Sequence, residues 1–206
     1  SPLFIKNEFP KCENSTETYK ILNNLVDKYL NLTDFKDSFK SDNKNFYYPK
    51  SVIKNFKNHI KFTKFVTIQW RKVWPKGRQN QQRLLANGKE LADKLASVLP
   101  KNILIRLVNT ASMPMKNQIS LIRNTDYLVG IHGAGLSLSI YMKKDAILHE
   151  ILHESNIKVL VLMSALSGHK TYSDIIKAEV NFNEDLQNIY FDTTDFVNSV
   201  KNHMEE

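Results

Sequence analysis

Residues 123–152, RNTDYLVGIHGAGLSLSIYMKKDAILHEIL, constrain the possible fold more than any other stretch of the chain. An apolar run of strand length at 127–131 is followed by a glycine-rich turn and by an apolar pattern with helical spacing over 134–142. A second apolar run at 146–152 closes the unit. Strand, glycine turn, helix and strand follow one another in this order in parallel α/β units, so the segment predicts a parallel sheet.

The turn His132-Gly133-Ala134-Gly135-Leu136 lies where the predicted strand passes into the predicted helix. The first backbone N–H groups of a helix have no partner within it, and the helix dipole favours an anion there. Because glycine has no Cβ, two glycines let a phosphate group approach the backbone closely. The turn is therefore a candidate phosphate-binding site. The alternative is that the glycines serve only a tight turn and close packing.

Two polar residues near the turn favour the ligand-binding interpretation. His132 comes directly before the glycines, and Glu150 lies near the end of the next predicted strand. Ligands of open α/β sheets bind at the carboxyl ends of the strands, where both side chains are expected. Histidine can donate a hydrogen bond to a phosphate oxygen, and a carboxylate can accept hydrogen bonds from ribose hydroxyls. The alternatives are a structural hydrogen bond for His132, and a surface ion pair with Lys143 or Lys144 for Glu150.

The rest of the chain continues the alternation of strands and helices. Apolar patterns predict further strands over 65–71, 103–108, 170–176 and 189–192, and further helices over 81–99, 115–123, 156–166 and 193–204. This alternation requires an α/β fold, a Rossmann-like and mainly parallel sheet with helices on both faces. We assign this domain to residues 62–206.

The first part of the chain, residues 1–61, is predicted as a helical segment or as the remnant of another lobe. Helical spacing over 16–30 and 51–60, with a long polar connection over 31–50, supports this interpretation. Two glycosylation sequons, at Asn14 and Asn31, weakly favour a secretory compartment.

Composition restricts the class of protein. A chain of 206 residues with 42% hydrophobic content suits one soluble core with an appendage. No apolar run is long enough to span a bilayer, and a membrane anchor, if there is one, is expected outside this chain. The single cysteine, Cys12, forms neither an internal disulfide nor a metal cluster. The net charge of +8 suits nucleic acid, but no nucleic-acid motif accompanies the lysines, so we expect no nucleic-acid partner.

The order NTDYLVGIHGAGL, apolar helix, and strand ending in glutamate resembles the signature of glycosyltransferase family 61, over roughly residues 62–206. The resemblance implies two facing Rossmann-like lobes, the GT-B arrangement, of which this chain is similar to the C-terminal, donor-binding one. An arginine at the end of a strand suits phosphate oxygens. The family places such an arginine before the donor site, followed by an arginine and an asparagine. Arg71, Arg78 and Asn80 match this pattern, although the loop before Arg78 is longer here.

Asp126 and Gln118 also match the family pattern. We interpret Asp126 as a cap or turn residue, and Gln118 as a residue that packs or lines the crevice. Further donor-binding residues implied by the resemblance are His132, the turn that follows it and Glu150.

The resemblance implies an inverting, metal-independent glycosyltransferase of the Golgi or endoplasmic reticulum lumen, with a nucleotide-sugar donor, most simply linked to UDP, and a glycan or glycoprotein acceptor. No cofactor and no metal are expected, because the sequence contains no Asp-x-Asp motif, and arginines and a helix N-terminus would neutralise the diphosphate. His149 and His153 flank Glu150, but alternation along a strand places Glu150 on the other face, so they form no compact metal site. The sequence identifies no catalytic base.

Two other functions remain possible interpretations of the sequence. HGAG resembles the oxyanion-hole loop of esterases, but the chain lacks the G-x-S-x-G nucleophile elbow that such enzymes need. The other alternative is a non-catalytic nucleotide-sugar-binding or interaction module. Binding of uridine diphosphate and turnover of its sugars distinguish these functions.

Overall fold

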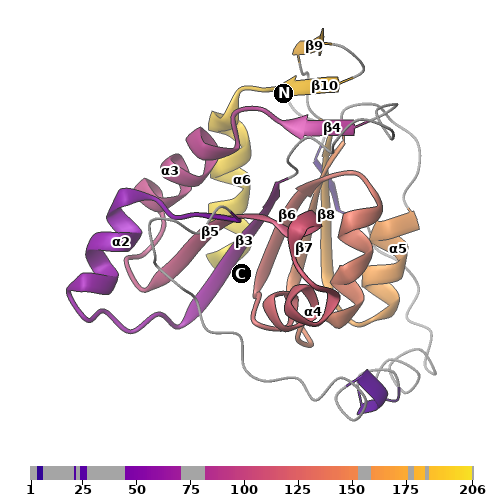
Figure 1. The fold of residues 1–206 in the computed structure, drawn as a ribbon, viewed down its shortest axis with the longest axis horizontal. Coiled ribbons are helices and arrows are strands. Elements are labelled where there is room, and N and C mark those ends of the chain that lie inside the picture. The colour runs from indigo at the N-terminus through magenta and orange to yellow at the C-terminus, as the bar shows by residue number, and fades with distance from the viewer. Residues whose placement is uncertain are drawn as a thin grey trace.

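The structure is a computed structural model, and it describes residues 4–6, 21, 24–26, 45–70, 82–152, 159–175, 179–183 and 186–205. Within these ranges the main sheet has seven strands, in the order β1-β8-β7-β6-β3-β5-β2 (Figure 1). The central strands are β5 (Ile103–Asn109), β3 (Lys64–Trp70), β6 (Tyr127–Ile131), β7 (Ile147–Leu152) and β8 (Lys170–Ile175). They are parallel to one another, so the predicted fold class is confirmed.

Both edges of this sheet come from the first part of the chain. β1 (Phe4–Lys6) pairs antiparallel with β8, and β2 (Phe46–Tyr47) pairs antiparallel with β5. β2 lies within residues 31–50, where the sequence predicted a long polar connection. The helix predicted over 51–60 is α2 (Lys50–Lys57), with Pro49 at its N-cap.

Helices cover both faces of the sheet, as predicted (Figure 1). One face carries α2, α3 (Gly88–Val98) and α6 (Thr193–Glu205). The other carries α4 (Met115–Arg123), η2 (Ala134–Tyr141) and α5 (Val159–Leu166). β3 and β6 are neighbours in the sheet, although β5 lies between them in sequence. The direction in which the chain adds strands to the sheet therefore reverses between β3 and β6. Such a reversal leaves a crevice at the carboxyl ends of the two strands, where ligands of doubly wound sheets bind.

The helix predicted over 81–99 is wrong in its first half. Residues Gln82–Leu85 form strand β4, which pairs in parallel with β10 (Leu186–Tyr190), and α3 begins only at Gly88. Strand pairing with a distant segment overrides a leucine pattern that is also compatible with a helix. β10 pairs with β9 (Glu179–Asn183), and these strands make a separate small sheet in the order β4-β10-β9.

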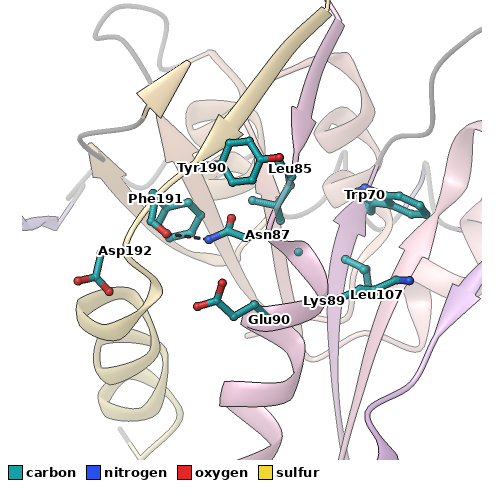
Figure 2. A pocket seen from close by; sticks show the side chains of 11 residues that line it. Trp70, Leu85, Asn87, Lys89, Glu90, Leu107, Tyr190, Phe191 and Asp192 are labelled. Carbon is teal, nitrogen blue, oxygen red and sulfur yellow. Dashed lines mark hydrogen bonds between the residues drawn. The ribbon is translucent and has the colours of Figure 1, made fainter. Parts of the chain in front are cut away.

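A cavity of about 740 Å³ lies where the end of β3, the start of α3 and the end of β10 meet (Figure 2). Trp70, Leu107, Tyr190 and Phe191 supply aromatic and apolar walls. Asn87, just before α3, donates from Nδ2 to the carbonyl oxygen of Phe191 at 2.7 Å. This hydrogen bond joins the start of α3 to the chain that leaves β10.

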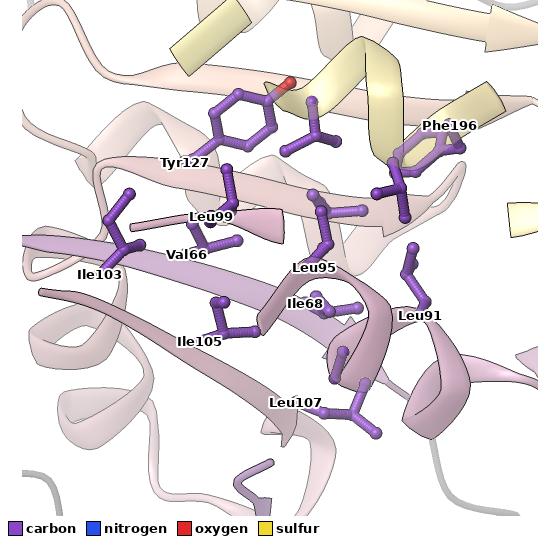
Figure 3. Packing of buried hydrophobic residues seen from close by; sticks show 14 of the residues in the cluster. Val66, Ile68, Leu91, Leu95, Leu99, Ile103, Ile105, Leu107, Tyr127 and Phe196 are labelled. Atoms are coloured by element: carbon purple, nitrogen blue, oxygen red, sulfur yellow. The ribbon is translucent and has the colours of Figure 1, made fainter. Parts of the chain in front are cut away.

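The larger core cluster lies between the sheet and the helices α2, α3 and α6 (Figure 3). Leu91 and Leu95 of α3 are fully buried against Val66 and Ile68 of β3, and Phe196 of α6 closes the cluster. Burying one such side chain contributes about 1.5–3 kcal/mol. This packing fixes β3, and with it the strand end at the reversal point of the sheet.

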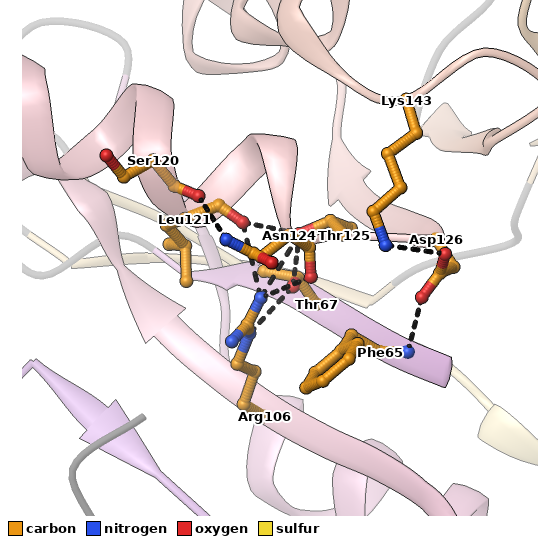
Figure 4. Close-up of polar contacts among 9 residues, drawn as sticks. All are labelled: Phe65, Thr67, Arg106, Ser120, Leu121, Asn124, Thr125, Asp126 and Lys143. Atoms are coloured by element: carbon orange, nitrogen blue, oxygen red, sulfur yellow. Dashed lines mark hydrogen bonds and ion pairs between the residues drawn. The ribbon is translucent and has the colours of Figure 1, made fainter. Parts of the chain in front are cut away.

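On the opposite face, a buried arginine ties β5 to β3 and to the end of α4 (Figure 4). Arg106 is fully buried and donates to Thr67 Oγ1 at 3.0 Å and to the carbonyl oxygens of Leu121 and Asn124 at 3.3 and 3.0 Å. Asp126 accepts from the backbone N–H of Phe65 at 2.8 Å, which confirms its prediction as a turn residue. These contacts set the start of β6 against β3.

Candidate functional site

The glycine turn follows β6 at the reversal point of the sheet and is hydrogen-bonded to β3. Gln69, near the end of β3, donates from Nε2 to Thr110 Oγ1 at 2.8 Å and to the carbonyl oxygen of Gly135 at 3.2 Å. The side chain thus links the turn to the connection that follows β5. Sequence reasoning missed Gln69, because its partners are distant in the chain.

Strand register places Gln69, Gly130, Glu150 and Ser173 in one row across four neighbouring strands. In-register residues of parallel strands point to the same face of the sheet. The side chains of Gln69, Glu150 and Ser173 therefore share the face that carries η2. Gly130 interrupts the row, and a Cβ built there lies 2.7 Å from Cδ2 of the buried Leu136. Gly130 therefore allows Leu136 to lie directly on the sheet. A glycine within a predicted strand was the available signal for such a close approach.

The segment after the turn is a 3-10 helix, Ala134–Tyr141, where an α-helix over 134–142 was expected. Its hydrogen bonds connect residues three apart, as from Leu136 N–H to the oxygen of Gly133 at 2.9 Å. Leu136, Leu138 and Met142 are buried against the sheet and α4, and this packing holds the segment in the tighter winding. The amide of Leu136 is already bonded within the turn, whereas Gly133, Ala134 and Gly135 are half-buried or exposed.

His132 and Glu150 form a pair behind the turn. His132 Nδ1–H donates to Glu150 Oε1 at 2.6 Å. The His132 side chain is 20% exposed and the Glu150 side chain is fully buried, so the imidazole lies between the carboxylate and the surface. Burial raises the pKa of Glu150 above its ordinary value, and the hydrogen bond and charge of His132 oppose this shift. The second carboxylate oxygen, Oε2, is buried and has no hydrogen-bond partner among the described atoms.

Arg71, Arg78 and Asn80 fall outside the described residues, which resume at residue 82 after β3 ends at Trp70. Gln118 donates to the carbonyl oxygen of Met113 at 2.8 Å and so packs the start of α4.

His149 points to the face opposite Glu150, as alternation along the strand predicted. It is fully buried against Phe196 of α6 and is hydrogen-bonded to the hydroxyl group of Tyr127 at 2.8 Å. His153 lies outside the described residues. In the part of the chain that the structure describes, no group of three or more His, Cys, Asp or Glu side chains is arranged to hold a metal ion. None of the helices described there is long and apolar enough to cross a membrane.

Comparison with known proteins adds one match. The model of the family described as Glycosyltransferase 61 matches residues 3–148. This range contains the glycine turn and ends just before Glu150. It also contains residues 3–61, which the resemblance in sequence left out. No individual curated protein matches the chain.

Proposed function

Because the chain belongs to glycosyltransferase family 61, we propose that it forms the donor-binding part of an enzyme that transfers a sugar from a uridine diphosphate donor. The observation that carries this proposal is the partly exposed glycine turn at the reversal point of the sheet, backed by the His132–Glu150 pair. The backbone amides of Gly133, Ala134 and Gly135 would approach the diphosphate. A crevice between β3 and β6 suits such a ligand.

In the proposed reaction an acceptor hydroxyl attacks the anomeric carbon while the bond to the diphosphate oxygen breaks. The new glycosidic bond takes the inverted configuration, and uridine diphosphate leaves with the bonding electron pair. The protein must stabilise the charge that develops on this leaving group. We assign that task to His132, to the turn amides and to Arg71, Arg78 and Asn80. In this proposal the cationic and N–H groups take the place of a metal ion.

Glu150 supports a role different from the ribose contact expected from the sequence. It is fully buried, and His132 lies between it and the surface of the turn. A carboxylate that accepts from Nδ1–H fixes the orientation of an imidazole ring. We therefore assign Glu150 to positioning His132 against the diphosphate. The energy of a hydrogen bond to a charged group, about 1.5–3 kcal/mol, is enough to hold one ring orientation.

Family membership supports the remaining parts of the proposal without specifying them. The acceptor is a glycan or a glycoprotein, and the enzyme acts in the lumen of the Golgi or endoplasmic reticulum. The catalytic base that takes the acceptor proton lies on a second lobe of a GT-B enzyme, which faces the crevice. A transfer assay with uridine diphosphate sugars separates this enzyme from a non-catalytic nucleotide-sugar-binding module.

Calorimetry with uridine diphosphate in the presence of a chelator tests the proposal. We expect saturable binding that added manganese does not strengthen. His132→Ala should weaken it by at least about tenfold, the effect of losing roughly 1.4 kcal/mol. Met115→Ala, at a position that is 59% exposed on α4, is the matched control and should bind like the parent protein. Binding that requires manganese would exclude the metal-independent mechanism, and the absence of binding under both conditions would exclude the donor site.

A further inference from the structure

The cavity beside α3 lies on the other side of β3 from the glycine turn. Gln69 points to the face of η2, so its neighbour Trp70 points to the face of α3, where it lines the cavity (Figure 2). We propose that this cavity is a second binding site, which takes one neutral pyranose unit of a saccharide. The proposal goes beyond donor binding and does not depend on it, because the donor turn lies on the opposite face.

The walls of the cavity offer flat aromatic surface with polar groups at the rim. Trp70 stands at the end of β3 and Tyr190 at the end of β10, where Tyr190 is 44% exposed. Leu85, Leu107 and the buried Phe191 complete the apolar part. A pyranose ring has one or two faces that carry mainly C–H groups, and such a face packs on aromatic rings as other apolar groups do. The volume of about 740 Å³ lies in the range of small-molecule sites.

The carboxylates at the rim are hydrogen-bond acceptors at neutral pH. The hydrogen bond from Lys94 holds the pKa of Glu90 below its ordinary value. The hydrogen bond from the backbone N–H of Thr194, at 2.8 Å, does the same for the pKa of Asp192. Ionised carboxylates accept hydrogen bonds and do not donate them. A ligand that presents several hydroxyl donors, as a sugar does, complements this rim.

The charges around the cavity favour a neutral ligand over a phosphate. Lys89 is part of the lining, but its ammonium group lies 5.3 Å from the centre of the Tyr47 ring. Lys94 is paired with Glu90 at 2.8 Å. Both cations are therefore engaged by neighbouring side chains, and the carboxylates of Glu90 and Asp192 would repel a diphosphate. This distribution distinguishes the cavity from the turn on the other face.

Asn87 at the centre of the lining supplies an independent observation (Figure 2). Its Nδ2 donates to Phe191, but Oδ1 is buried without a hydrogen-bond partner among the described atoms. An unpaired buried carbonyl oxygen is unfavourable, and a ligand hydroxyl group that reached it through a small rotation of the Asn87 side chain would relieve this cost. The cavity thus combines an apolar stacking surface, ionised acceptors and one unsatisfied amide oxygen.

A titration followed by the backbone amide signals of the whole chain tests the proposal. The probes are the methyl glycosides of glucose, galactose, mannose and N-acetylglucosamine. We expect saturable shifts for at least one of them at millimolar concentration, centred on Gly88, Tyr190 and Asp192. Tyr190→Ala should weaken this binding by at least about tenfold. Met115→Ala, another exposed apolar side chain, should leave it unchanged.

Trp70→Phe provides a second variant that keeps an aromatic ring, and its binding should fall between those of the parent and Tyr190→Ala. The absence of saturable shifts with every glycoside would overturn the proposal, as would shifts that survive in folded Tyr190→Ala. Uridine diphosphate, added to the same sample, should move the amides of the glycine turn and not those of the cavity. Competition between uridine diphosphate and a glycoside for the cavity would assign it to the donor site and so also overturn the proposal.

Discussion

Replacing Gly130 by alanine tests how closely the glycine turn depends on the sheet beneath it. The new Cβ would lie 2.7 Å from Leu136 Cδ2, whereas carbon atoms in contact are optimally about 3.5–4.0 Å apart. Leu136 Cδ2 must therefore retreat by roughly 1 Å, and because Leu136 is fully buried, we expect the turn to move with it. Overpacking of this kind lowers the free energy of unfolding by about 1–3 kcal/mol. For a chain of this length the midpoint of thermal unfolding should fall by roughly 2–12 °C.

For Gly130→Ala, the affinity for uridine diphosphate must be measured together with the stability. A loss of stability alone leaves binding by the folded protein unchanged, whereas a displaced turn weakens it. Gly168→Ala is the matched control. Gly168 has φ 85°, and a Cβ there meets no atom within 4 Å. The strained backbone should cost about 1–2 kcal/mol of stability without changing affinity. Leu136→Val should partly rescue Gly130→Ala, because it removes the atom that clashes. If Gly130→Ala binds and melts like the parent protein, or if the two changes are simply additive, the packing argument is refuted.

Three further predictions concern the same site. Gly135→Val should abolish binding of uridine diphosphate in a protein that still unfolds cooperatively, because a branched side chain would lie between the turn amides and the ligand. Calorimetry and thermal unfolding, measured together, check this prediction. Glu150→Gln should weaken binding by roughly tenfold or more, because the hydrogen bond that positions His132 then goes to a neutral amide oxygen and no longer to a carboxylate. Unchanged affinity in the folded variant would remove Glu150 from the site. Because burial raises the pKa of Glu150 above 4.5, the folded protein binds more protons than the unfolded chain, so this group makes stability fall as pH rises above 4.5. Denaturant unfolding should show that the free energy of unfolding of Glu150→Gln rises relative to that of the parent as the pH is raised above 4.5. A difference that does not change with pH would contradict the shift.

The sequence predicted those parts of the fold that depend on local patterns. The apolar runs at Tyr127–Ile131 and Ile147–Leu152 form neighbouring parallel strands, and the glycine turn follows the first of them. Helices on both faces follow from the same alternation. These features depend on side-chain period and on glycine positions, which a single sequence displays.

The errors and omissions have a common physical origin in contacts between distant segments. Residues Gln82–Leu85 became a strand because β10 pairs with them, about a hundred residues further along the chain. Gln69 reaches Gly135 across 66 positions, and Gly130 matters because of where Leu136 comes to lie. The burial of Glu150 behind His132 also appears only when β6 and β7 stand side by side. No local pattern contains this information.

The edge strands of the main sheet have a consequence for the order of folding. β1 pairs with β8, with Phe4 opposite Asp174, so the first described strand finds its partner only after about 170 further residues have been synthesised. At translation rates of roughly 5–20 residues per second, this strand waits on the order of ten seconds or more for its partner. During that interval the nascent chain carries an unpaired strand, the feature of β proteins that invites association with other chains. The parallel strands β5, β3, β6 and β7 are all made before or without β8, so closing the edge at β8 is expected to be a late step in the maturation of this domain.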